Sequence, residues 1–142
     1  IRLFIITLFI ALTTLGASAQ EPYILSWVPG DLDGDRVPER VIVVSPDSPD
    51  PTSTTSKKEL RVLKRKGDKY VLVYKMPIDA RFSTNLAQWQ YEDPATRPWG
   101  LSYEPAQRGR KASVMVCFVS NSGEFFHLVF DGKSYRAESS GD

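Results

Sequence analysis

The sequence predicts a small all-β domain, mostly antiparallel and built from hairpins, with at most one short helix. Apolar residues after residue 20 alternate with a period of two, which is typical of strands with one buried face. Short segments rich in Gly, Asn, Asp and Ser separate these strands and suit tight turns. Because the chain has only 142 residues, we expect a single domain, closed as an open barrel or a sandwich.

The first 19 residues have the features of a secretory signal peptide. Arg2 precedes the apolar run Leu3–Leu15, and Ala17-Ser18-Ala19 has the small-x-small pattern that signal peptidase accepts. A membrane anchor needs about 20 apolar residues, and this run is shorter. We therefore expect cleavage after Ala19, no integral membrane segment afterwards, and a secreted or periplasmic bacterial domain over residues 20–142.

Two strands are expected before the first long loop. Tyr23–Val28 is a short strand, and Arg40–Val44 carries consecutive apolar β-branched residues that predict burial on both faces. The segment after them, about residues 45–56, has three prolines and no large apolar residue. We expect it to be a mobile surface loop that contributes nothing to a core.

A hairpin follows this loop. Leu60–Leu63 and Tyr70–Met76 alternate as strands, and Gly67 lies in the turn between them. Strict alternation in the second strand puts every second side chain from Tyr70 to Met76 on one face.

A second hairpin joins Ser113–Ser120 to Phe125–Phe130. The turn at Asp131 and Gly132 then leads into a short last strand around Tyr135. The tail from about residue 138 is expected to fray.

The middle of the chain is the hardest part to assign. Residues 84–92 fit either a short helix or a strand, and both remain open. Four aromatic residues lie in or near this proline-broken segment, and on loops they could stack on sugar rings or anchor a protein partner. These candidate ligand-binding residues are Trp89, Tyr91, Trp99 and Tyr103, for which core packing is the alternative.

Charge and cysteine content narrow the function classes. The 18 basic and 17 acidic residues leave a formal net charge of +1, so nothing indicates a nucleic-acid partner. The lone Cys117 cannot form an internal disulfide. An exported domain without disulfides must be stabilised by its core or by a bound metal.

The acidic segment Asp31–Glu39 is the most informative part of the sequence. Carboxylates at every second position, with Gly34 among them, let a tight loop turn its oxygens inward. Calcium prefers about six to eight oxygen ligands, and this spacing suits a calcium loop. The candidate ligands are Asp31, Asp33, Asp35, the carbonyl of Val37, and Glu39 directly or through water. The alternative is a metal-free solvated turn.

The run DLDGDRVPERVIVV, residues 31–44, resembles the loop and strand of FG-GAP and VCBS repeats, which are calcium-binding blades of β-propellers. The resemblance extends loosely to Met76 and to the FDGKSYR segment near the C-terminus. It implies that the four acidic residues of the loop are the calcium ligands and that Val41–Val44 is the strand that the loop feeds. The chain is too short for a whole propeller, so the resemblance implies a partial, blade-like unit.

Two residues depart from known loop patterns. Arg36 stands where these loops usually have Gly, and a positive φ there would cost about 1 kcal/mol. Whether Arg36 disables the cation loop is therefore open. Ile42 stands where an EF-hand has its bidentate Glu, so the loop is not an EF-hand.

Catalytic motifs are scarce in the sequence. The single histidine, His127, alternates with Phe125 and Val129 as a half-buried sheet residue does. There is no Gly-x-Ser-x-Gly, His-Glu-x-x-His, phosphate-binding loop or dinucleotide fingerprint. Spacing alone does not decide whether carboxylates distant in the sequence form a catalytic pair.

We therefore expect an exported, non-catalytic binding module of the bacterial envelope or medium, with a structural calcium loop and a carbohydrate or envelope protein as partner. The first alternative is an inhibitor or immunity-type protein that blocks a lysozyme-like cell-wall hydrolase. The second is a small carboxylate-dependent hydrolase. The oligomeric state stays open at this stage.

Overall fold

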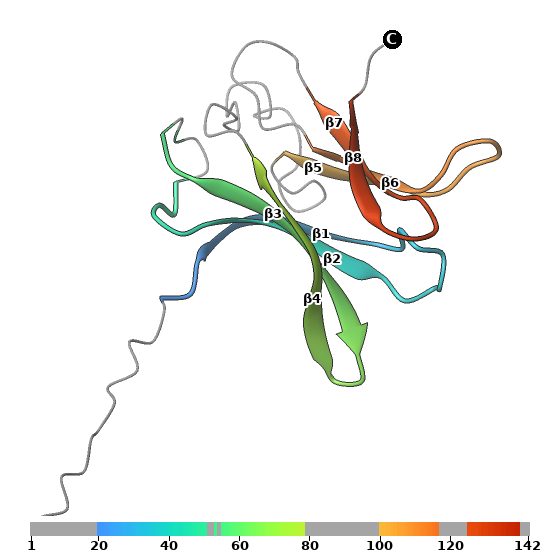
Figure 1. Ribbon diagram of the computed structural model, residues 1–142, viewed down its shortest axis with the longest axis horizontal. Helices are drawn as coiled ribbons and strands as arrows, with labels where there is room; N and C mark the ends of the chain where they lie inside the picture. Colours follow the sequence, from blue (N-terminus) through green and yellow to red (C-terminus); the bar gives the residue numbers. More distant parts are fainter. Residues whose placement is uncertain (1–19, 51–52, 54, 79–99, 117–124, 140–142) are drawn as a thin grey trace, which may run out of the picture.

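The structure, a computed structural model, describes residues 20–50, 53, 55–78, 100–116 and 125–139 (Figure 1). Over these ranges the chain forms two four-stranded antiparallel sheets and no helix, which confirms the predicted all-β single domain. The predicted signal peptide and the ambiguous segment 84–92 lie outside the described residues. No helix within the described part is long and apolar enough to cross a membrane.

The first sheet contains the strands of the N-terminal half in sequence order. These strands are β1 (Tyr23–Gly30), β2 (Glu39–Ser45), β3 (Lys58–Lys66) and β4 (Lys69–Ile78). The predicted turn at Gly67 joins β3 to β4, and its φ of 65° is one that glycine adopts without strain. The hairpin predicted from Leu60 to Met76 is confirmed.

The second sheet repeats the same meander with the C-terminal half. Its strands are β5 (Leu101–Glu104), β6 (Ser113–Val116), β7 (Phe126–Phe130) and β8 (Tyr135–Ser139). The pairing of β6 with β7 and the last strand around Tyr135 are as predicted. The remainder of the strand predicted to Ser120, and the turn after it, lie outside the described residues. Strand β8 includes Glu138 and Ser139, where fraying was expected, and the tail after Ser139 lies outside the described residues.

One hydrophobic core lies between the two sheets. Its buried strand residues come from both sheets: Val28, Val41, Val43, Leu60, Val62 and Ile78 from the first, and Leu101, Val114, Val116, Leu128 and Tyr135 from the second. Strand β2 is buried on both faces, because its outward-facing Ile42 and Val44 are only 8% and 1% exposed. This confirms the interpretation of its continuous apolar run.

The expectation that alternate side chains from Tyr70 to Met76 share one face is wrong. The register of β3 with β4 shifts between Val62 and Leu63, so that Leu63 opposes Leu72 while Val62 opposes Tyr74. The residue between them, Val73, is the extra residue of a β-bulge, which reverses the alternation. Tyr74 therefore packs against the core, whereas Leu72 is 44% exposed.

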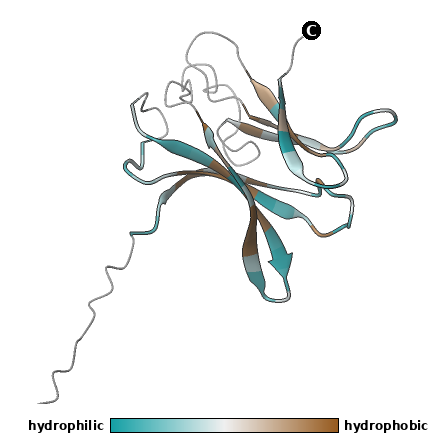
Figure 2. Cartoon of the chain, in the orientation of Figure 1, coloured by the Kyte–Doolittle hydropathy of each residue, from teal (hydrophilic) through white to brown (hydrophobic). Residues whose placement is uncertain are grey.

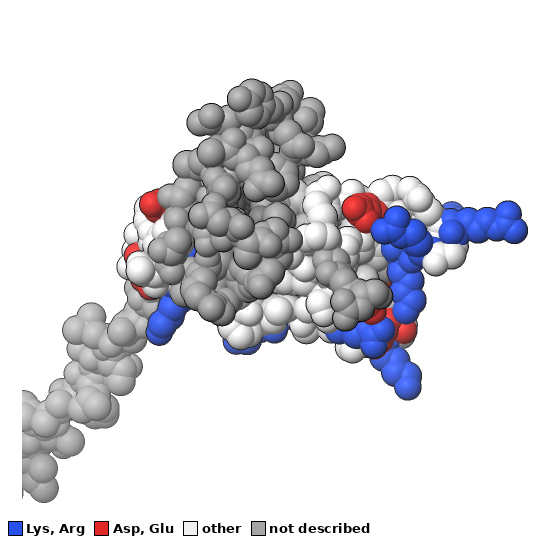
Figure 3. Space-filling view, turned by 90° about the horizontal axis from the view of Figure 1, so that it is seen from above, with Lys and Arg blue, Asp and Glu red and all other residues white. Residues whose placement is uncertain are grey.

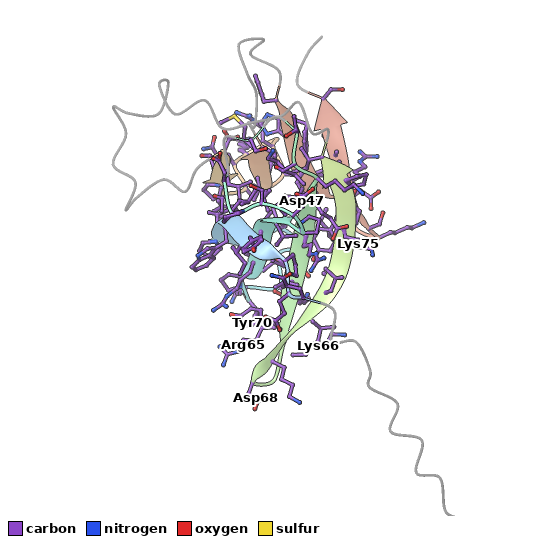
Figure 4. All side chains as sticks on the ribbon, turned by 90° about the vertical axis from the view of Figure 1, so that its left-hand side faces the viewer. Asp47, Arg65, Lys66, Asp68, Tyr70 and Lys75 are labelled. Carbon is purple, nitrogen blue, oxygen red and sulfur yellow. The ribbon has the colours of Figure 1, made fainter. Side chains whose placement is uncertain are left out.

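The β3–β4 hairpin projects beyond the second sheet, and Figure 2 shows its hydrophobic β4 side reaching past the core. Arg65, Lys66 and Asp68 lie at its far end (Figure 4). Because nothing in the second sheet covers this end, the side chains of Val71 and Leu72 are both at least 40% exposed although they point to opposite faces.

Hydrogen bonds connect the described residues of the long loop after β2. Asp47 accepts from Ser45 Oγ at 2.9 Å and from the Lys57 backbone N–H at 3.3 Å. The buried Lys58 ammonium donates to the Ser53 carbonyl and to Ser56 Oγ. The loop predicted at about 45–56 is thus connected to the start of β3 through polar groups, and none of its described residues belongs to the core cluster.

Candidate functional site

The acidic loop connects β1 to β2 at one end of the first sheet. Gly30 and Glu39 pair across the two strands, so the loop closes directly after the last pair of the ladder. Gly34 has a φ of 79°, and Arg36 has a φ of 68°. Arg36 is the non-glycine residue with positive φ in the described ranges, which is the strained conformation that the sequence led us to consider.

Side chains of the loop bind its own backbone. Both carboxylate oxygens of Asp31 accept N–H groups, from Gly34 and from Arg36, each at 2.9 Å. Asp33 accepts from the Asp35 N–H at 3.1 Å. Asp35 in turn accepts from the N–H of the exposed Val37 at 2.8 Å. These Asx-type bonds fold the loop into a compact turn with its carboxylates directed inward.

Three of the predicted ligand side chains converge. Carboxylate oxygens of Asp31, Asp33 and Glu39 all lie within 4.8 Å of one another. Two oxygens that bind one calcium ion, at about 2.3–2.6 Å each, can be at most about 5 Å apart. This spacing allows the three carboxylates to supply part of the roughly six to eight oxygen ligands that calcium takes.

Lys64 from β3 lies beside this group. Its ammonium contacts Asp33 Oδ2 and lies 2.8 Å from Asp35 Oδ2. The hydrogen bond with Asp33, followed by that with Asp35, raises the pKa of Lys64, while the bond from Lys64 lowers the pKa of Asp35. Lys64 thus pairs with both Asp33 and Asp35. Asp35, which was also predicted as a ligand, is not in the group of three converging carboxylates.

Glu39 has a second role that sequence reasoning missed. Its side chain is fully buried, accepts the Leu32 N–H at Oε2 (2.8 Å), and accepts the Tyr135 hydroxyl at Oε1 (2.9 Å). Burial raises the pKa of this carboxyl, although the two hydrogen bonds oppose the shift. Because Tyr135 belongs to β8, this bond links the acidic loop of the first sheet to the second sheet.

Of the four aromatic residues predicted to bind a ligand, the structure describes Tyr103, which lies on β5. The other three, Trp89, Tyr91 and Trp99, lie outside the described residues. Its hydroxyl donates to the Asp31 carbonyl at 3.2 Å. A Cβ on Gly30 would lie 2.3 Å from the Tyr103 ring, so the ring packs directly on the backbone where the loop begins. In this position Tyr103 contributes to fixing the acidic loop.

A different aromatic group lies on the outer face of the first sheet. The Arg40 guanidinium lies 3.9 Å from the Tyr70 ring centroid and 5.3 Å from that of Trp27. Trp27 is 47% exposed and Tyr70 is 38% exposed, so both rings are accessible. Alternation along β1 is enough to place Trp27 on the face opposite the buried Val28. The contact of Arg40 with Tyr70 was not predictable, because the β4 bulge decides on which face Tyr70 lies.

Comparison with protein-family models, with curated proteins and with solved structures finds no match to this chain. The site is therefore interpreted from its own geometry.

Proposed function

We propose that this protein is an exported, non-catalytic binding module of the bacterial envelope or medium, with a structural calcium site in the Asp31–Glu39 loop and carbohydrate as its ligand. The observation that carries the proposal is the convergence of three carboxylates at the turn that sets the β1–β2 register. The exported location follows from the expected signal peptide.

The calcium part rests on the donor set. Asp31, Asp33 and Glu39 would hold the ion, and its charge would offset the repulsion among their carboxylates. The compact turn with left-handed backbone at Gly34 and Arg36 agrees with the resemblance to FG-GAP and VCBS loops. Each sheet is also a four-stranded antiparallel meander, the arrangement of a propeller blade.

The binding part rests on the exposed rings that the loop helps to order. Arg40 directly follows Glu39 in β2, and it opposes Pro29 two residues after Trp27. A loop of fixed geometry therefore fixes the position of Arg40 relative to Trp27. Exposed aromatic faces stack on the apolar faces of sugar rings, and the guanidinium adds hydrogen-bond donors beside them.

Thermal unfolding with calcium and with chelator tests the structural metal. We expect calcium to raise the unfolding temperature of the protein, and the increase to be absent in Asp33→Ala. Equal unfolding temperatures in calcium and chelator would refute the calcium part.

Retention on insoluble bacterial cell-wall polysaccharide tests the ligand. Trp27→Ala is expected to lower the retained fraction at least five-fold. The matched control is Tyr23→Ala, which removes another exposed ring of β1. Retention of Trp27→Ala equal to that of the wild type would refute the carbohydrate part and leave the calcium result standing.

A further inference from the structure

The outer face of the second sheet carries a pocket of about 290 Å³ that is separate from the acidic loop. Its floor is formed by Ser113 on β6 and by His127 and Val129 on β7. Arg110 and Lys111, in the connection from β5 to β6, line one side. Figure 3 shows Lys and Arg side chains gathered at the end of the molecule where this connection projects in Figure 1.

The two polar residues of the floor are held together. Ser113 Oγ and His127 Nδ1 lie 3.2 Å apart, and Ser113 is only 6% exposed. If the serine donates, the neutral imidazole carries its proton on Nε2; if the imidazole donates, the serine hydroxyl keeps its own proton. In either tautomer this pair keeps one further donor for a ligand.

The charges around the pocket favour an anion. The acidic lining residue, Glu138, accepts from Arg136 Nε at 3.0 Å and from Nη2 at 2.6 Å, so its charge is compensated. Arg110 makes a loose, exposed ion pair with Glu104 at 3.6 Å. Because Arg136 offsets Glu138 and Arg110 is paired with Glu104, the Lys111 ammonium leaves these charged groups around the pocket with one positive charge in excess.

We propose that this pocket binds a phosphate group, either as the free ion or as a small monoester. A tetrahedral dianion accepts hydrogen bonds from several directions, as the guanidinium, ammonium and floor donors here would supply them. A planar carboxylate accepts its strongest bonds near one plane and matches this arrangement less well. Because both cations are exposed, binding is weak and salt-sensitive, with a dissociation constant in the millimolar range.

The test is calorimetric titration of the whole protein with inorganic phosphate, glycerol phosphate and acetate at matched ionic strength. We expect saturable binding of phosphate, at least five-fold weakened in the double variant Arg110→Gln/Lys111→Gln. Arg108→Gln is the matched control, because it removes an exposed cation from the same connection that does not line the pocket. It should bind phosphate within two-fold of the wild type.

Ser113→Ala provides an independent measurement, since it removes the hydrogen bond that orients the His127 imidazole in the floor without changing any formal charge. It should also weaken phosphate binding, and circular dichroism should show that each variant is folded. Tighter binding of glycerol phosphate than of phosphate would support the site and identify a monoester as its ligand. Acetate binding as tight as phosphate binding, or equal losses in Arg108→Gln and the double variant, would overturn the proposal.

Discussion

The bond between Tyr135 and Glu39 predicts a large effect from the loss of one hydroxyl. Tyr135→Phe keeps the ring, which lies 4.9 Å from Phe130 and 6.0 Å from Tyr74 between centroids. It removes the donor to Glu39 Oε1 in a fully buried position. Leaving a buried acceptor without its partner costs about 1–3 kcal/mol. For a domain of this size, that loss lowers the unfolding temperature by roughly 4–12 °C.

Urea and thermal unfolding in chelator measure this effect without any contribution from calcium. Tyr70→Phe is the matched control, because it removes a hydroxyl from an exposed tyrosine whose ring packs on Arg40. We expect the control to change the free energy of unfolding by less than about 0.5 kcal/mol. If Tyr135→Phe unfolds within 1 °C of the wild type, the bond is not a stabilising link between the sheets.

Three further predictions concern the acidic loop. Lys64→Met removes a positive charge close to the converging carboxylates, so calcium affinity should rise by about ten-fold while stability in chelator falls. The magnitude follows from Coulomb repulsion on the order of 1–2 kcal/mol between a single charge and a divalent ion about 5 Å away in water. An unchanged calcium affinity of Lys64→Met in a calorimetric titration would contradict this. Arg36→Gly relieves a left-handed residue and should stabilise the protein by up to about 1 kcal/mol, whereas Gly34→Ala should destabilise it by a similar amount, as measured by urea unfolding. The opposite signs would show that the left-handed conformations are not strained as described. Burial raises the pKa of Glu39, so the folded protein keeps this carboxyl protonated at a higher pH than the unfolded chain does. Stability in chelator should therefore fall as the pH rises from the ordinary pKa of 4.5 toward the raised pKa. Glu39→Gln should lack this component of the decline in urea titrations across that pH range.

The strands were predictable because their signals are local. Alternation, the apolar run of β2 and the turn glycines each involve neighbouring residues, and these predictions hold in the structure. The β4 bulge was not predictable, because an extra residue at Val73 leaves the sequence pattern apolar throughout. What it changes is the face on which each side chain lies.

The candidate site shows the same difference between features set by neighbouring residues, which were predictable, and features set by long-range contacts, which were not. The loop spacing placed Asp31, Asp33 and Glu39 together, and their convergence follows from contacts within nine residues. The partners that define their environment come from far along the chain: Lys64 from β3, Tyr103 from β5 and Tyr135 from β8. No local pattern indicates such contacts, because they depend on how the two sheets pack.

Calorimetric titration of calcium into chelator-stripped protein tests the central proposal most directly. We predict saturable binding of one ion per chain to the wild type and none to Asp31→Asn/Asp33→Asn. Asp68→Asn, which removes a carboxylate at the hairpin end, should bind like the wild type. Absence of saturable binding to the wild type, or equal binding by the double variant, would contradict the proposed calcium site.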